Sequence, residues 1–188
     1  MTDLASLYQQ IDQLITEVRQ EGNARAAIWD RQIHRPEFRD SAHNLACYLA
    51  LRHRDLCALQ RPLMQLGLSS LGRLESRVLP GLLAVRGALA ALAGRPVEKP
   101  VPARQFFAGE EHLKQRSHEI FGPSSPARPV TLLVTCPSAA ADDPSFMVEL
   151  AIRGVEAIRI NCAHDDPERW QKMIDNARAA GQSTGRQL

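Results

Sequence analysis

Apolar residues recur at two different periods along this chain, and the change from one period to the other divides it. Through the first 94 residues they return at steps of three and four, which is typical of amphipathic helices. From residue 130 to residue 180, short apolar runs alternate with helix-like segments. The pattern predicts an α + α/β protein, in which a helical module precedes a strand–helix–strand–helix segment.

The helical module begins with a strong amphipathic stripe. A helix is predicted over residues 3–31, ended or interrupted at Gly22-Asn23, and two further helices are expected from Ser41 and over residues 56–66. The stripe of the first helix consists of Leu4, Leu7, Ile11, Leu14, Ile15 and Val18.

The longest helix is predicted at the end of this module. It would run from Leu71 to Leu92 after an N-cap at Ser69-Ser70, with a kink at Pro80 and an end at Gly94. Leucine and valine recur along it at steps of three and four. This regular seam indicates a helix that faces either the core or a partner.

Proline-rich segments separate the helical module from the strands. Residues 95–104 predict a stiff extended linker, residues 110–121 a short helix, and residues 122–129 a second linker. The expected organisation is therefore a helical module at 1–94, a linker region with one short helix at 95–129, and a βαβα segment at 130–188.

Two short strands are predicted in the βαβα segment, at residues 131–135 and 157–161. Each is followed by an Asp-Pro pair, Asp143-Pro144 and Asp166-Pro167, which suits the N-cap and first position of a helix. Strands joined through a helix must be parallel. Both strands are apolar on both faces, so we expect them to be buried on both sides or to be covered by association.

Length and composition narrow the possible classes of protein. With 188 residues, the chain is too short for a closed eight-stranded βα barrel, which needs about 250. The formal net charge of +2 argues against a partner such as bulk nucleic acid, and no leader or membrane-spanning run is apparent. The four cysteines show no disulfide or metal spacing, which favours the cytoplasm.

Candidate chemistry follows the second predicted strand. Arg159 could bind a phosphoryl group through its guanidinium fork, or form a surface ion pair. Asn161 could bind a cation or cap the turn, and His164 could contact a ligand or support the following helix. The adjacent Asp165 and Asp166 are more typical of helix capping than of a metal site. A zinc site built from Cys136, Cys162 and His164 would match no standard spacing.

The spacing R-x-N-x-x-H of Arg159, Asn161 and His164 resembles the start of the pyruvate kinase barrel, and residues 135–180 are similar to its first two βα units. Leu68-Ser69-Ser70-Leu71-Gly72-Arg73 also resembles a bacterial subgroup with a helical extension before the barrel. The resemblance implies phosphoryl transfer between phosphoenolpyruvate and ADP, with Mg²⁺ and K⁺. Arg159 would be catalytic and bind the phosphoryl group, Asn161 would bind the monovalent cation, and His164 would lie by the nucleotide.

The chain departs from that family at several points. Ala163 stands where the family usually has a serine that is a second cation ligand, and Cys136-Pro137-Ser138 replaces a usual glycine. The catalytic lysine and the metal-binding carboxylates of the family would lie beyond Leu188. We therefore expect an incomplete (β/α)8-type barrel fragment that is inactive on its own.

Two other classes of function remain open. One is a non-catalytic helical interaction or regulatory protein. The other is a DNA-binding helix-turn-helix protein, with its turn and second helix at residues 66–77, although the chain offers few early basic residues there. In each case the protein is expected to act without a membrane, and the exposed strand edges predict a homo-oligomer.

Overall fold

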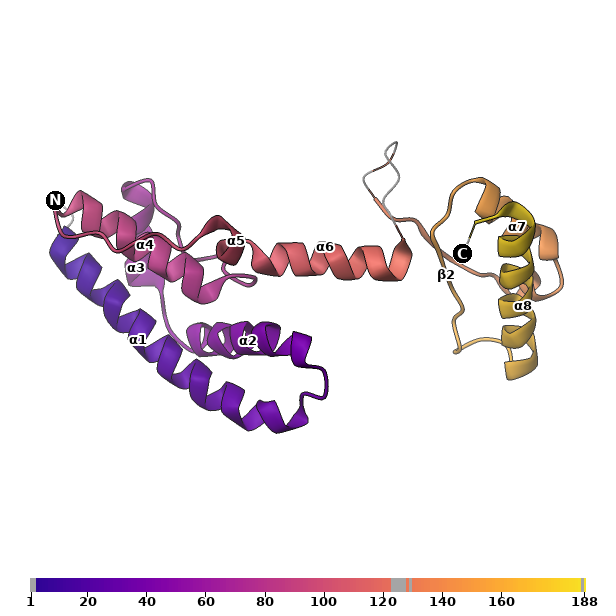
Figure 1. Cartoon of the computed structure of the whole chain (residues 1–188), viewed down its shortest axis with the longest axis horizontal. Helices are drawn as coiled ribbons and strands as arrows, with labels where there is room; N and C mark the ends of the chain where they lie inside the picture. The colour runs from indigo at the N-terminus through magenta and orange to yellow at the C-terminus, as the bar shows by residue number, and fades with distance from the viewer. Residues whose placement is uncertain (1–2, 123–127, 129, 187) are drawn as a thin grey trace. The chain divides into compact units, whose positions relative to one another are not determined.

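The computed structural model describes residues 3–122, 128, 130–186 and 188. This part of the chain is mostly helical (66%), and it contains one sheet of two parallel strands. It divides into two compact units, residues 1–113 and 114–188. The boundary between the units falls inside helix α6 (Ala108–Phe121) (Figure 1).

The first unit is built from helices that surround one apolar core. They are α1 (Leu4–Trp29), α2 (Arg39–Arg52), α3 (Cys57–Gln65), α4 (Val78–Leu92) and the short α5 (Ala103–Phe106), with 3-10 turns η1 (Asp30–Gln32) and η2 (Pro36–Phe38) between α1 and α2. Helix α1 packs against both α2 and α4 (Figure 1). The apolar stripe of α1 is buried against them, and the largest fully buried side chains include Ile11, Ile15, Val18, Leu63, Leu82 and Leu89.

Helix α1 continues through Gly22-Asn23, so the predicted interruption there is wrong. Gly22 is buried where α1 meets α2. A Cβ atom at this position would lie 2.6 Å from Cys47 Sγ and 3.2 Å from the Cys47 Cα and N atoms. The glycine therefore permits a close approach of two helices rather than a turn.

The predicted helix from Leu71 to Leu92 begins later than expected, at Val78. Leu71 has a φ of 61°, in the left-handed region that a helix cannot accommodate. The start of α4 is capped from another helix: Asn44 of α2 accepts a hydrogen bond from Val78 N at 3.0 Å and donates one to Glu75 O at 2.6 Å. Pro80 then falls in the first turn, where a missing N–H costs nothing, so no kink is required.

Residues 66–77 contain no helix. The second helix of a helix-turn-helix motif was expected there, and the segment is a loop stabilised by Leu71 N, which donates to Ser69 Oγ, and by the contacts of Asn44. The geometric premise of the DNA-binding interpretation is therefore wrong.

The proline-rich segment after α4 contacts helices α1 and α4 of the same unit. Arg86 of α4 forms ion pairs with Asp12 at 2.6 Å and with Glu98 at 2.5 Å, and the guanidinium of Arg95 lies 4.7 Å from the centre of the Tyr8 ring. Residues 95–102 are therefore held along α1 and α4 by charge and by a cation–π contact.

The second unit has the predicted βαβα order. Strands β1 (Leu133–Thr135) and β2 (Ala157–Arg159) pair in parallel, and Leu133 lies opposite Ala157. The 3-10 turn η3 (Ser138–Ala141) and helix α7 (Pro144–Ile152) connect them, and α8 (Pro167–Thr184) follows β2. As predicted, Asp143 and Asp166 are the N-caps of α7 and α8, accepting hydrogen bonds from Ser145 N at 3.0 Å and Arg169 N at 2.9 Å.

The sheet is covered on one face and open on the other. Ile158 and Ile160 pack against a core that contains Met147 and Met173 from α7 and α8. Leu133, by contrast, is 52% exposed. Of the two expected alternatives, burial of both faces is therefore wrong within the described part of the chain, because both helices lie on the same side of the sheet; cover by association stays a prediction.

Candidate functional site

The two strands end at a shared cavity. Its volume is about 250 Å³, and it lies at the carboxyl ends of β1 and β2, the edge of a parallel sheet at which α/β proteins build binding sites. The turns after the two strands provide most of its polar groups. The lining residues are Thr135, Cys136, Pro137, Ser138, Ile160, Asn161, His164, Asp165 and Met173.

Asn161 and His164, two of the three residues singled out in the sequence, come together in this lining. Asn161 Oδ1 accepts a hydrogen bond from Ala163 N at 3.3 Å, and Asn161 O accepts one from His164 N at 3.1 Å. His164 O in turn accepts a hydrogen bond from Trp170 Nε1 at 2.7 Å. The turn is thus fixed by backbone and amide contacts, while the imidazole of His164 stays exposed at the cavity.

Asp165 lines the cavity and contacts two residues that the sequence reasoning missed, Ser138 in the lining and Arg169 outside it. Its Oδ2 accepts a hydrogen bond from Ser138 Oγ at 2.9 Å, and its Oδ1 lies 3.5 Å from Arg169 Nε, an ion pair without a hydrogen bond. Arg169 also donates to Ser138 O at 2.9 Å and to Asp142 at 2.8 Å. The i, i+4 spacing of Asp165 and Arg169 was the available signal for this ion pair.

Arg159 lies outside this lining. It occupies the last position of β2, opposite Thr135. Because side chains alternate across a strand, Arg159 projects to the face opposite Ile158 and Ile160, which is the open one. Its side chain is exposed and makes no hydrogen bond or ion pair with the other residues that the structure describes. The three residues of the R-x-N-x-x-H spacing therefore reach two different surfaces.

The donor set of the cavity suits a metal poorly. Asp165 is its one carboxylate in the described part of the chain, and Arg169 already balances that charge. Mg²⁺ takes carboxylate and phosphate oxygens, so these residues do not fit a protein-held Mg²⁺. A monovalent cation would find Asn161 Oδ1 and the hydroxyl of Thr135, but Oδ1 is shared with Ala163 N.

The cysteines beside the cavity do not assemble a zinc site either. Burial raises the pKa of the Cys136 thiol, whereas Cys162 is exposed. Within residues 3–122, 128, 130–186 and 188, no three His, Cys, Asp or Glu side chains are grouped as metal ligands would be.

Comparisons of this chain with protein-family models, with curated proteins and with solved structures find no match. Of the helices described, none is both long and apolar enough to cross a membrane.

Proposed function

We propose that this chain carries the first two βα units of a pyruvate kinase-like barrel, and that Arg159 binds the phosphoryl group of phosphoenolpyruvate. One observation carries the proposal: a guanidinium that has no partner among the described residues stands at the carboxyl end of β2, on the sheet face that α7 and α8 leave open. In a βα barrel the helices cover the outer face of the strands, and the reactive groups stand at their carboxyl ends.

The distribution of side chains over the sheet supports a barrel fragment. Ile158 and Ile160 contact the helices, as outward-facing barrel residues do. Leu133 and Arg159 belong to the other face, which in a closed barrel is the interior and its mouth.

In this proposal Arg159 acts by electrostatic stabilisation of the phosphoryl group. Phosphoryl transfer spreads negative charge over the equatorial oxygens, and a guanidinium donates to two of them at once. In the same proposal His164 lies near the phosphates of ADP and Asn161 contributes one oxygen to a K⁺ site. Mg²⁺ would bind through the substrates and through groups other than the cavity residues described above, since Asp165 is paired with Arg169.

Phosphoenolpyruvate is expected to bind this chain weakly and through Arg159. The test is an amide NMR titration with phosphoenolpyruvate, in which Thr135, Arg159 and neighbouring signals should shift and saturate. Arg159→Gln removes a charge-assisted contact and should weaken binding about tenfold or more. Arg153→Gln is the matched control, because Arg153 is an exposed arginine at the C-cap of α7 and is paired with Glu149. Equal binding by both variants would refute the role of Arg159.

The same purified chain is expected not to convert phosphoenolpyruvate and ADP to pyruvate and ATP in a coupled assay. Positioning and metal electrostatics supply nearly all the catalysis in phosphoryl transfer, and the cavity residues do not hold the metal. Turnover above background that disappears in Arg159→Ala would show that the described residues form a complete catalytic site, contrary to this proposal.

The main alternative is a non-catalytic helical interaction or regulatory protein. It is favoured by the first unit, which has an apolar core of its own built from α1 to α4 and the loop before α4. If the NMR titration shows no binding at Arg159, this alternative becomes the better account.

We also propose that the second unit self-associates through its open sheet. Val130, Leu132 and Leu133 are 59%, 38% and 52% exposed beside strand edges whose N–H and C=O groups can pair with another copy. Light scattering is expected to report a dimer or larger species, and Leu133→Lys should shift it toward monomer. Ile152→Lys, at an exposed position of α7, is the control. A wild-type protein that is strictly monomeric would contradict the proposal.

A further inference from the structure

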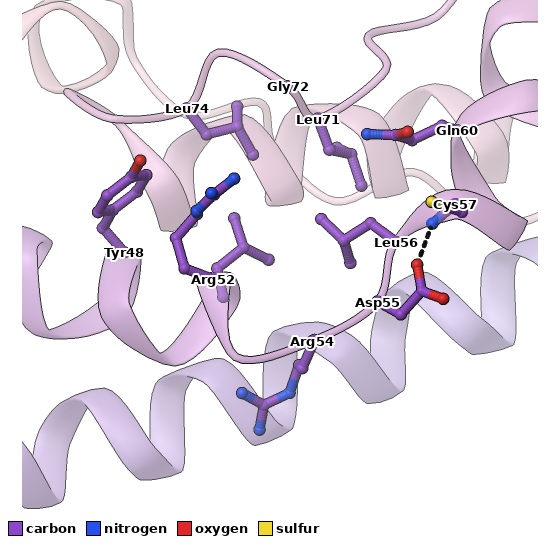
Figure 2. Close-up of a pocket in the computed structure, with 11 residues that line it drawn as sticks. Tyr48, Arg52, Arg54, Asp55, Leu56, Cys57, Gln60, Leu71, Gly72 and Leu74 are labelled. Atoms are coloured by element: carbon purple, nitrogen blue, oxygen red, sulfur yellow. Dashed lines mark hydrogen bonds between the residues drawn. The ribbon is translucent and has the colours of Figure 1, made fainter.

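A second pocket lies within the helical unit. It has a volume of about 210 Å³ and is formed by the end of α2, the start of α3 and the loop before α4 (Figure 2). Its lining mixes leucines with groups that can donate hydrogen bonds. The lining residues are Tyr48, Leu51, Arg52, Arg54, Asp55, Leu56, Cys57, Gln60, Leu71, Gly72 and Leu74.

The three charged residues of this lining differ in how many hydrogen bonds and ion pairs they form within the protein. Arg54 turns away toward α1, where it donates to Glu17 and Glu21 at 3.1 Å each (Figure 2). The carboxylate of Asp55 accepts a hydrogen bond from Cys57 N at 2.9 Å, at the start of α3. Both groups are therefore satisfied within the protein.

Arg52 differs from its two charged neighbours. It rises from α2 toward the loop that carries Leu71 and Leu74 (Figure 2). No hydrogen bond or ion pair of its side chain is present among the described residues. The pocket is therefore lined by a guanidinium with five donors that forms no ion pair with the described residues, while the one carboxylate of the lining, Asp55, is hydrogen-bonded at the start of α3.

The loop on the opposite wall adds donors of its own. Leu71 has a φ of 61°, and its N–H donates to Ser69 Oγ at 3.2 Å. The N–H of Gly72, which lines the pocket, has no hydrogen-bond partner in the part of the chain that the structure describes. A backbone that passes through the left-handed region can direct its N–H groups into a concave site suited to an anion. The hydroxyl of Tyr48 and the amide of Gln60 extend the set of donors.

We propose that this pocket binds a small oxyanion, a phosphate or a carboxylate group, between the guanidinium of Arg52 and the backbone N–H of Gly72. Arginine matches both groups because its planar fork can donate two parallel hydrogen bonds to them. The pocket is smaller than the range of about 300–1,000 Å³ that holds drug-sized ligands. Its occupant is therefore a small metabolite or the anionic end of one. This inference does not depend on the phosphoryl site at Arg159, since it concerns the other unit.

The test is an NMR titration of the whole chain with inorganic phosphate and, separately, with acetate at constant ionic strength. We expect saturable shifts of the amides of Ser70, Leu71, Gly72 and Arg73, with a dissociation constant on the order of 1 mM for at least one of the two probes. Arg52→Gln should weaken that binding about tenfold or more, because the charge-assisted contacts are lost. Arg52→Lys keeps the charge without the fork, and is expected to bind at an intermediate strength.

Arg61→Gln is the matched control, because it removes the same charge from an exposed position of α3 outside the pocket. It should leave the affinity unchanged, which separates a pocket from general surface charge. Saturation by phosphate or by acetate supports the proposal and names the preferred group. Shifts that fail to saturate with either probe, or that weaken equally in Arg52→Gln and Arg61→Gln, overturn it. Because Arg52 is exposed, its variants are expected to fold, and their circular dichroism spectra check this.

Discussion

Replacing Gly22 by alanine is expected to destabilise the helical unit by about 1–3 kcal/mol, the usual cost of inserting a methyl group into a close-packed contact. The new Cβ would lie 2.6 Å from Cys47 Sγ and 3.2 Å from Cys47 backbone atoms, so α1 and α2 would have to separate. Alanine is the better helix former by about 1 kcal/mol, and this gain offsets only part of the cost. Urea unfolding followed by circular dichroism measures the difference.

Replacing Gly87 by alanine is expected to change the free energy of unfolding in the opposite direction. The two variants together therefore separate the effect of the close contact from the effect of helix propensity. Gly87 lies within α4, and a Cβ atom there would meet nothing within 4 Å. Gly87→Ala should therefore stabilise the protein by about 0.5–1 kcal/mol through reduced backbone entropy alone. If both variants are stabilised, the α1–α2 contact is looser than the structure describes. If both variants are destabilised, the higher helix propensity of alanine does not determine the stability change at Gly87.

A helix start could be predicted from the sequence where the residues that cap it lie next to it in the chain. Asp143-Pro144 and Asp166-Pro167 start α7 and α8 as expected, because an N-cap and a first-turn proline act through the adjacent backbone. The start of α4 could not be read in this way, since its capping group is Asn44, which is 34 residues earlier in the chain. Gly22 likewise resembles a helix stop until its contact with Cys47 is known. Both differences come from tertiary contacts that a local pattern does not contain.

The sequence predicted where the candidate site lies, at the ends of the strands, better than it predicted which surface each side chain reaches. The order of strands and helices placed Arg159, Asn161 and His164 at the ends of parallel strands, and the pairing of β1 with β2 confirms that position. Which surface each side chain reaches depends on where the strand stops. Since β2 ends at Arg159, Asn161 belongs to a turn and not to the strand alternation, and it lines the cavity that Arg159 does not.

Glu156→Ala is expected to destabilise the second unit by about 1–3 kcal/mol, because it leaves partners of a half-buried carboxylate unpaired. One oxygen of Glu156 accepts a hydrogen bond from Leu132 N at 2.8 Å, and the other pairs with Arg128, which also donates to Gly154 O at 2.7 Å. The carboxylate thus ties the residue before β1 to the start of β2, and its side chain is only 13% exposed. Glu149→Gln, which loses a surface i, i+4 pair with Arg153, should cost no more than about 0.5 kcal/mol.

The contribution of Glu156 should also depend on pH, with a defined sign. The hydrogen bond from Leu132 N, together with the Arg128 guanidinium, holds the pKa of Glu156 below its ordinary value, although burial opposes the shift. A carboxyl whose pKa is lower in the folded state stabilises the fold above its unfolded pKa of about 4.3, and this stabilisation is lost as the pH falls through the folded value. Unfolding of the second unit can be followed by the fluorescence of Trp170 in a Trp29→Phe background. The stability difference between wild type and Glu156→Gln should be constant from pH 7 to pH 5 and shrink below about pH 4.3. A difference that stays constant down to pH 3 would mean that the charge of Glu156 does not hold the two strands together.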